Sequence, residues 1–411
     1  MRERTPRNIY AFGFTSFFND TASEMAYWVL PAFLASIGAG PAQLGIIEGI
    51  AESIASFAKL ISGQLADRIP RRKPVVVAGY FVANAVKPLL ALTTHWVQIL
   101  GIRFADRFSK GIRGTTRDVM VAEAVRRGHR GSAYGLIQAM DSAGAIAGPG
   151  IALAVLAMHH SMRTVFWLAA IPGALCILMA FFGISETTRG GEEGGDPPPA
   201  KPQFAADRLD APEFGSESTI GRLVRRLPAG FYYVLGAVAL FSLGNSSDMF
   251  LVLRAQGVGI PVVEAPLLGL VFNVTYTLLA WPAGRVSDRW PRRRVAAAGY
   301  LVFAIVYLVF ALAPSRLAIW VTMAFYGLFY ALTAPVLKAL VVETVSEDVR
   351  GRALGVFFFT TSVATLLASV ITGELWKVYG ARLPFLLSAA AAVVAAGMLV
   401  AQRGEKSQRL A

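Results

Sequence analysis

The chain has 411 residues, of which 55% are hydrophobic and only 16% are charged, and its formal net charge is +13. A soluble domain carries about 25% charged residues, so this composition excludes an ordinary soluble fold. The surplus of Lys and Arg does not call for a nucleic-acid partner, because basic loops beside membrane spans account for it.

In chain order, apolar stretches long enough to cross about 30 Å of hydrocarbon occur in two groups of six. The first group covers 9–37, 44–65, 74–92, 97–121, 133–158 and 164–184, and the second covers 231–253, 265–286, 295–312, 317–337, 353–372 and 385–401. No small-residue cleavage site follows the first stretch, so we expect a retained helix rather than a signal peptide. The pattern predicts an all-α integral membrane protein with twelve transmembrane helices.

Basic residues indicate the orientation of these spans. They gather after the second, fourth and eighth stretches, at 68–73, 126–130 and 289–294, whereas the loops at 36–43 and 93–96 are nearly uncharged. By the positive-inside rule we expect both termini to be cytoplasmic, in the inner membrane of a bacterium. Cys176 is the single cysteine, so no disulfide forms within the chain.

The chain divides into two related halves. Residues 185–230 are rich in Gly, Pro and charge and predict a cytoplasmic linker between an N-terminal half, 1–184, and a C-terminal half, 231–411. GQLADRIPRRK at 63–73 matches GRVSDRWPRRR at 284–294, RGSAYG at 130–135 matches RGRALG at 350–355, and SEM at 23–25 more faintly matches SDM at 247–249. We therefore predict two parallel six-helix repeats, an arrangement of secondary transporters that bind substrate between the repeats.

Charges interrupt the apolar stretches of the first half. Arg103, Asp106, Arg107 and Lys110 fall at an offset of 220 from Met323, Tyr326, Gly327 and Tyr330, so the fold itself does not require charge there. A charge at the bilayer centre costs roughly 2.5–3.5 kcal/mol, so these groups must pair or line a wet cavity. Two interpretations stay open: a functional polar interior, or a static network of ion pairs with Glu48, Glu52 or Asp141.

Three motifs resemble the major facilitator superfamily. GQLADRIPRRK, from Gly63 to Lys73, resembles its signature loop, with Pro70 and Pro291 where the family usually has Gly. RFSKG, 107–111, resembles the span-four motif, and GAIAGPG, 144–150, resembles an incomplete span-five motif of proton-coupled exporters. The resemblance covers the whole chain and is strongest to prokaryotic members with drug/proton-antiporter-like motifs. It implies transport by alternating access and names no substrate.

Roles follow from this resemblance and from the chemistry of the residues. Asp67 can pair with arginines and with a helix N-terminus. The predicted conformational latch is Gly63, Asp67, Arg68, Arg71, Arg113, Arg117 and Asp288. The predicted proton-coupling residues are Asp20, Glu24, Arg107 and Asp141. The predicted substrate contacts are Asn19, Glu48, Glu52, Lys87, Arg103, Lys110, Asn245, Asp248, Asn273, Tyr276, Tyr326 and Tyr330.

The leading prediction is a proton-coupled exporter of a small organic solute. An importer or exchanger of organic anions remains open through Lys87, Arg103, Arg107 and Lys110, and a divalent-cation transporter through Asn19, Asp20 and Glu24. An enzyme is not expected, because the sequence offers neither a nucleophile–base pair nor His/Cys metal spacing. We expect no cofactor and no bound metal, a proton gradient as energy source, a small-molecule substrate and membrane lipid as partners, no nucleic acid, and a monomer.

Overall fold

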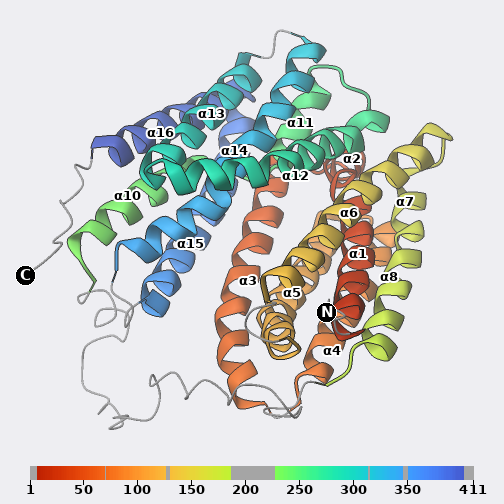
Figure 1. Cartoon of the computed structure of the whole chain (residues 1–411). Coiled ribbons are helices and arrows are strands. Elements are labelled where there is room, and N and C mark those ends of the chain that lie inside the picture. The colour runs from red at the N-terminus through yellow and green to blue at the C-terminus, as the bar shows by residue number, and fades with distance from the viewer. Residues whose placement is uncertain are drawn as a thin grey trace, which may run out of the picture.

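The computed structural model of the chain describes residues 7–69, 71–125, 130–186, 227–312, 315–345 and 350–401. All regular structure in these ranges is helical (Figure 1). Most of the predicted linker, 187–226, lies outside the described residues, so its role and the boundaries of the two halves stay predictions.

The first half contains eight α-helices and two shorter helical segments. They are α1 (Arg7–Tyr27), α2 (Leu30–Ser36), α3 (Pro41–Arg68), α4 (Lys73–Val86), η1 (Lys87–Leu92), α5 (Trp96–Glu123), α6 (Arg130–Ala157), α7 (Met162–Leu168), α8 (Ala170–Leu178) and the π-helical η3 (Met179–Gly183). Pro31 has no N–H for the carbonyl of Tyr27, so the first span is interrupted between α1 and α2. Ser161 caps α7 by accepting the N–H of Thr164 at 3.3 Å.

The second half follows the same plan. Its helices are α10 (Ala229–Gly244), α11 (Met249–Gly257), η4 (Val262–Glu264), α12 (Ala265–Arg289), α13 (Arg292–Leu312), α14 (Arg316–Glu343), α15 (Arg350–Tyr379) and α16 (Arg382–Ala401). Ser315 caps α14 through the N–H of Ala318 at 3.2 Å.

Nine helical segments among the described residues are long and apolar enough to cross a membrane. The nine do not include α1, α3 and α5, which have 21, 28 and 28 residues and carry the charges that interrupt the first half. The protein is a multi-pass membrane protein by these spans. The exact count of twelve stays a prediction.

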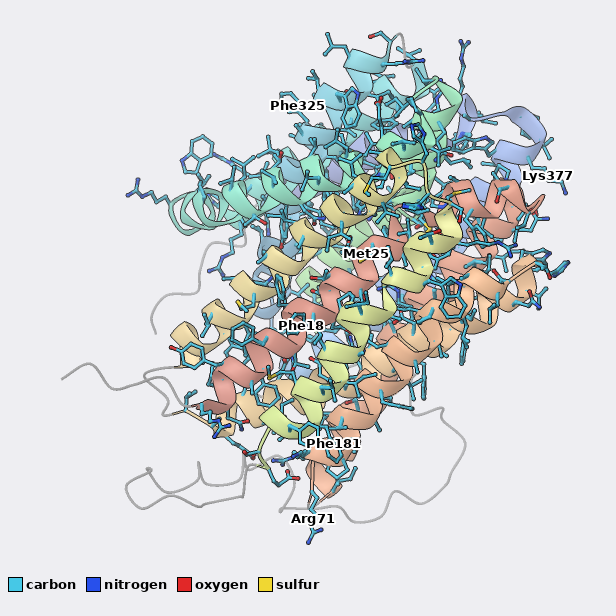
Figure 2. The ribbon with its side chains drawn as sticks, turned by 90° about the vertical axis from the view of Figure 1, so that its right-hand side faces the viewer. Phe18, Met25, Arg71, Phe181, Phe325 and Lys377 are labelled. Atoms are coloured by element: carbon cyan, nitrogen blue, oxygen red, sulfur yellow. The ribbon has the colours of Figure 1, made fainter. Side chains whose placement is uncertain are left out.

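The two halves lie side by side in Figure 1, with α3 of the first half next to α15 of the second. These helices run antiparallel and very close together, because a Cβ at Gly45 would collide with the carbonyl oxygen of Ser369. A second pair joins α6 to α12, where Asn273 Nδ2 donates to the carbonyl of Ala145 at 3.1 Å. Arg71 in the first basic loop and Lys377 near the end of α15 lie toward opposite ends of the molecule (Figure 2).

Candidate functional site

A cavity of about 350 Å³ lies between the halves, in the size range of small-molecule pockets. We call it the central cavity. The first half contributes α1, α3 and α5, and the second contributes α12, α14, α15 and the segment 245–248. Its lining residues are Glu24, Tyr27, Trp28, Glu52, Arg107, Asn245, Ser246, Ser247, Asp248, Phe272, Asn273, Tyr330 and Thr365.

The seventh span is unwound where it reaches the central cavity. α10 ends at Gly244 and α11 begins at Met249, with Asn245 at φ −97° and ψ 83°. The sequence Asn245-Ser-Ser-Asp248 supplies side chains that compete with the helix for backbone hydrogen bonds. Interrupted helices of this kind place polar side chains and free backbone groups at transporter binding sites.

Asp248 leaves this unwound segment toward two tyrosines. It stands at the N-cap position of α11 but makes no capping hydrogen bond. Its Oδ1 instead accepts the hydroxyl of Tyr326 at 2.5 Å and that of Tyr330 at 3.3 Å, both from α14. The side chain is therefore oriented by neutral donors.

Glu24 occupies the matching place in the first half. The duplicated SEM and SDM segments put Glu24 and Asp248 in equivalent positions, and both line the central cavity. Trp28 Nε1 donates to Glu24 Oε2 at 2.7 Å, one helical turn further along. Arg107 and Lys110 are the cationic groups that act on Glu24 through space.

Close packing of α6 on α1 places the acids of the first span. A Cβ at Gly144 would collide with the carbonyl of Phe17, and one at Gly148 would lie 2.6 Å from the carbonyl of Thr21 and 2.8 Å from the Cβ of Glu24. Figure 2 shows α1, with Phe18 and Met25, packed among its neighbouring helices. The glycines of the predicted span-five motif therefore fix the position of Glu24.

A smaller cavity of about 60 Å³, which we call the inner cavity, lies within the first half. A water molecule takes about 30 Å³ in the liquid, so the inner cavity has room for only a few waters. Its lining residues are Asp20, Ser23, Glu24, Ala26, Tyr27, Leu30, Lys87, Leu90, Ile102, Arg103, Asp106, Arg107, Lys110 and Arg113. Glu24, Tyr27 and Arg107 line both cavities, so they connect the two spaces.

Ion pairs organise the charges of this half. Arg103 binds the fully buried carboxylate of Glu48 through Nε at 2.9 Å and Nη2 at 2.7 Å. Arg107 Nη2 lies 3.2 Å from Glu52, and both guanidinium groups lie over the ring of Tyr27, at 5.5 and 5.9 Å. Such geometry satisfies charges that would otherwise be costly in a membrane.

The network continues to the far side of the inner cavity. Lys87 Nζ lies 3.7 Å from Asp106 and 3.0 Å from the Oδ1 of Asn84. Asn84 in turn donates to Asn19 Oδ1 at 3.2 Å, and Asn19 donates to Asp20 at 2.9 Å. Lysine, amides and carboxylates thus form one chain from α5 to α1.

One hydrogen bond ties the charges of the first half to the unwound segment of the second. Ser247 Oγ donates to Glu48 Oε2 at 3.2 Å. Glu48 was predicted as a substrate contact, but it is fully buried and lines neither cavity. It holds Arg103 and Ser247 in place from behind the cavity wall.

The remaining predicted residues fall into two places. Asp141 hydrogen-bonds Ser16 and lies near Asp20 and Arg117, and Arg117 donates to Ser16 at 3.0 Å, next to the inner cavity rather than on it. Tyr276 stacks on Phe272 with ring centroids 6.2 Å apart.

The latch stays a prediction. The side chains of Asp67, Arg68 and Asp288, with the surroundings of Gly63, lie outside what the structure describes. Arg113 lines the inner cavity with its guanidinium 4.5 Å from the ring centre of Tyr80. Arg71 is exposed and points away from the helices (Figure 2).

Glu186 lies beside this loop and was not singled out from the sequence. Its Oε1 accepts the backbone N–H of Arg72 at 2.8 Å, and its Oε2 accepts that of Lys73 at 3.0 Å. Arg72 also pairs with Glu123 at 2.6 Å. These bonds join the ends of the second, fourth and sixth spans.

Sequence reasoning also missed Trp28 and Ser247. Trp28 could have been found, because its spacing of four residues from Glu24 puts both on one helix face. Ser247 carries no comparable signal, since its partner Glu48 lies 199 residues away.

Comparison with known proteins agrees with this architecture. The family model described as Major Facilitator Superfamily matches residues 12–270 and 233–410. An uncharacterised MFS-type transporter of Methanocaldococcus jannaschii is 32% identical over 96% of this chain and 94% of its own. The multidrug resistance protein MdtG of Dickeya zeae is 22% identical over 94% and 92% of the two chains, and the class C tetracycline resistance protein of Escherichia coli is 24% identical over 77% and 75%.

Solved structures share the fold. A bacterial homologue of the human lysosomal transporter Spinster, in an inward-facing and unoccupied conformation, superposes with a TM-score of 0.75 at 15% identity, covering 97% of both chains. The nucleoside transporter NupG gives a TM-score of 0.73 at 16% identity, covering 96% of this chain and 99% of its own. These relatives and neighbours are transporters rather than enzymes, as the sequence predicts. The chain belongs to the major facilitator superfamily.

Proposed function

We propose that this transporter exports a small organic solute through the central cavity in exchange for protons. The observation that carries the proposal is the placement of Glu24 and Asp248 at equivalent positions of the two halves, both lining one cavity. A carboxylate that faces a cavity can exchange a proton for another interaction when its surroundings change.

Export is supported by two features. The relatives include proteins named for multidrug and tetracycline resistance. The glycines of the span-five motif hold α6 against α1 at Glu24, so that movement of α6 relative to α1 bears directly on this acid. Rocking of the halves would separate Glu24 from Arg107 on α5 or return it, and linkage makes proton and solute affinities reciprocal.

The organic-anion alternative has less support. Arg103, Arg107 and Lys87 are engaged with Glu48, Glu52 and Asp106 respectively. An anion would have to displace these partners. The divalent-cation alternative is weakened in a similar way, because the amide of Asn19 is bonded to Asn84 and Asp20.

The remaining expectations are part of the same proposal. The protein resides in the inner membrane of a bacterium with both termini in the cytoplasm, supported by the basic loops. It works as a monomer surrounded by lipid, without nucleic acid, and draws on the proton gradient without a cofactor or resident metal.

The proposal is tested in proteoliposomes carrying a pH-sensitive dye. Organic cations, organic anions, neutral solutes and divalent metals are added singly, and proton movement is recorded with solute flux. An organic solute that drives proton movement in the opposite direction supports the proposal. Proton movement driven only by organic anions or by metals contradicts it and selects the corresponding alternative.

Variants then locate the coupling. Glu24→Gln, or failing that Asp20→Asn, is expected to abolish pH-driven transport while solute exchange at equal pH continues, and Arg107→Ala is expected to lose both. Glu374→Gln, an exposed carboxylate on α15 that lines neither cavity, is the matched control. Full coupling in both acid variants would move the proton site to Asp141 or to Glu48 and Glu52.

A further inference from the structure

We infer that the solute is an organic monocation of the ammonium type, and that its charged group binds between Asp248 and the rings of Trp28, Phe272 and Tyr330. This inference rests on the proposed function, because it names the substrate class of the same cavity. It adds a binding site in the second half, where the first half supplies the coupling charges.

Charge balance is the first step. The charged groups of the first half around the two cavities comprise five cations, Lys87, Arg103, Arg107, Lys110 and Arg113, and five carboxylates, Asp20, Glu24, Glu48, Glu52 and Asp106. This set is neutral as a whole. Asp248 therefore adds one negative charge to the central cavity that no group of the set offsets.

Asp248 is also locally uncompensated. Among the residues whose side chains the structure describes, no Lys, Arg or His forms an ion pair with it. Its contacts are the hydroxyls of Tyr326 and Tyr330. A carboxylate removed from water stays charged only with a cation beside it, so this position requires a proton or a positively charged ligand.

Aromatic rings surround the space in front of the carboxylate. The ring of Phe272 lies 6.2 Å from that of Trp28 and 5.2 Å from that of Tyr330, and all three residues line the central cavity. Rings of this kind attract organic cations through their negative faces, most strongly where water is excluded. Tyr27 is less suited to this task, because Arg103 and Arg107 already lie over its ring.

Free polar groups complete the site. Asn245 Oδ1 and Ser246 Oγ are buried in the cavity wall, and neither has a hydrogen-bond partner among the described residues. Both oxygens are acceptors, as a ligand with N–H donors or an adjacent hydroxyl requires. Tyr326 is a positioning residue, because it orients Asp248 but does not line the cavity.

Two probes of the same shape separate charge from size. The cation 3-hydroxyphenyltrimethylammonium and its neutral isostere 3-tert-butylphenol are each titrated into the full-length purified protein in detergent, with empty micelles as the blank. We expect the cation to bind roughly tenfold or more tightly than the isostere, as one charge-assisted contact and one cation–π contact provide. Equal binding of the two probes, or binding of neither, would overturn the inference.

Variants assign the preference to this site. Asp248→Asn is expected to bring the two affinities together, Asp248→Glu to restore the preference, and Glu374→Gln to leave it unchanged. Phe272→Leu keeps the apolar volume but removes a ring, and should weaken cation binding about threefold to thirtyfold. If Asp248→Asn does not yield monodisperse protein, Phe272→Leu decides the matter, since unchanged cation affinity there contradicts the aromatic site. Retained preference in a folded Asp248→Asn also contradicts it.

The outcomes are independent of coupling. Binding in detergent uses no proton gradient, so a protein that binds the cation but moves no protons would refute the proposed function and leave this site intact. A protein that moves protons with a neutral solute and ignores the cation would do the reverse.

Discussion

In the first half, α5 carries Arg103, Asp106 and Arg107 along one face, and in the second half α14 carries Met323, Tyr326 and Gly327 at the same offset. Both helices reach the same central cavity from opposite sides. The first half solves the burial of polar groups with ion pairs, and the second solves it with hydroxyls and rings around a single acid. Duplicated halves have therefore kept one backbone plan while their interiors took up different chemistry.

The first span of each half shows the same contrast. α1 stays helical through Glu24, whereas the seventh span is unwound at Asp248. In the first half Gly144 and Gly148 bring α6 against α1, and at an offset of 220 the second half has Ala364 and Ala368, both buried. A tightly held acid faces a more loosely held one, which suits a division between coupling and binding.

The largest expected effect comes from breaking the charge network of the first half. Arg103→Ala leaves Glu48 fully buried with Ser247 as its remaining side-chain donor. Removing one partner of a buried ion pair costs about 3–5 kcal/mol, so the thermal midpoint in detergent should fall sharply. The double variant Glu48→Leu with Arg103→Met should recover much of the loss, because apolar replacement of both partners is often neutral. A single variant as stable as the parent would show that the pair does not hold this half together.

In the second half, the tyrosines that hold Asp248 should contribute unequally. Tyr326→Phe removes the 2.5 Å hydrogen bond, and Tyr330→Phe removes the longer one of 3.3 Å. A hydrogen bond to a charged group contributes about 1.5–3 kcal/mol, so Tyr326→Phe should lower the thermal midpoint clearly and Tyr330→Phe less. The measurement is thermal unfolding of both variants in the same detergent. Equal effects, or the reverse order, would contradict the assignment of Tyr326 as the main anchor.

Giving the first half the small residue of the second tests the role of helix approach. Gly148→Ala places a Cβ 2.6 Å from the carbonyl of Thr21 and 2.8 Å from the Cβ of Glu24. Overpacking of this kind costs about 1–3 kcal/mol and should displace Glu24, so stability and proton coupling should fall together. Gly150→Ala is the matched control, because nothing lies within 4 Å of the added Cβ and helix propensity favours Ala. Normal coupling in Gly148→Ala would separate the motif from the proton site.

Much of the architecture could be predicted because membrane burial leaves a strong mark on a sequence. Apolar length, basic loops and the repeated GQLADRIPRRK and GRVSDRWPRRR motifs are properties of the chain itself. The family and the multi-pass helical fold were predicted and are confirmed. The coupling and substrate roles of individual residues stay predictions.

The partners of each polar side chain could not be predicted, because they depend on helix rotation and on the contact between halves. Periodicity puts Glu48 and Glu52 on one face of α3, yet Glu48 is fully buried against Arg103 and Glu52 lines the cavity. A rotation of a few tens of degrees would exchange these environments. The hydrogen bond from Ser247 to Glu48 depends in addition on how the unwound segment of the second half meets the first.

The smallest expected effect is at this junction, where the two halves exchange a single hydrogen bond. Ser247→Ala removes the donor to Glu48 while leaving Arg103 in place, so the charge network of the first half stays paired. A hydrogen bond of this type contributes about 0.5–1.5 kcal/mol, which changes the ratio of two conformations by roughly twofold to tenfold. Spin labels at Ser36→Cys and Lys377→Cys, both exposed, report the distance between α2 and the end of α15, and Cys176 is buried. Because the bond exists only while the halves meet here, its loss should increase the population with the longer distance. Ser246→Ala removes a neighbouring hydroxyl that has no partner among the described residues and should leave the distribution unchanged. Identical distributions for Ser247→Ala and the parent would mean that the halves are held at this end by the packing of α3 on α15, with the polar contact contributing nothing to the balance between conformations.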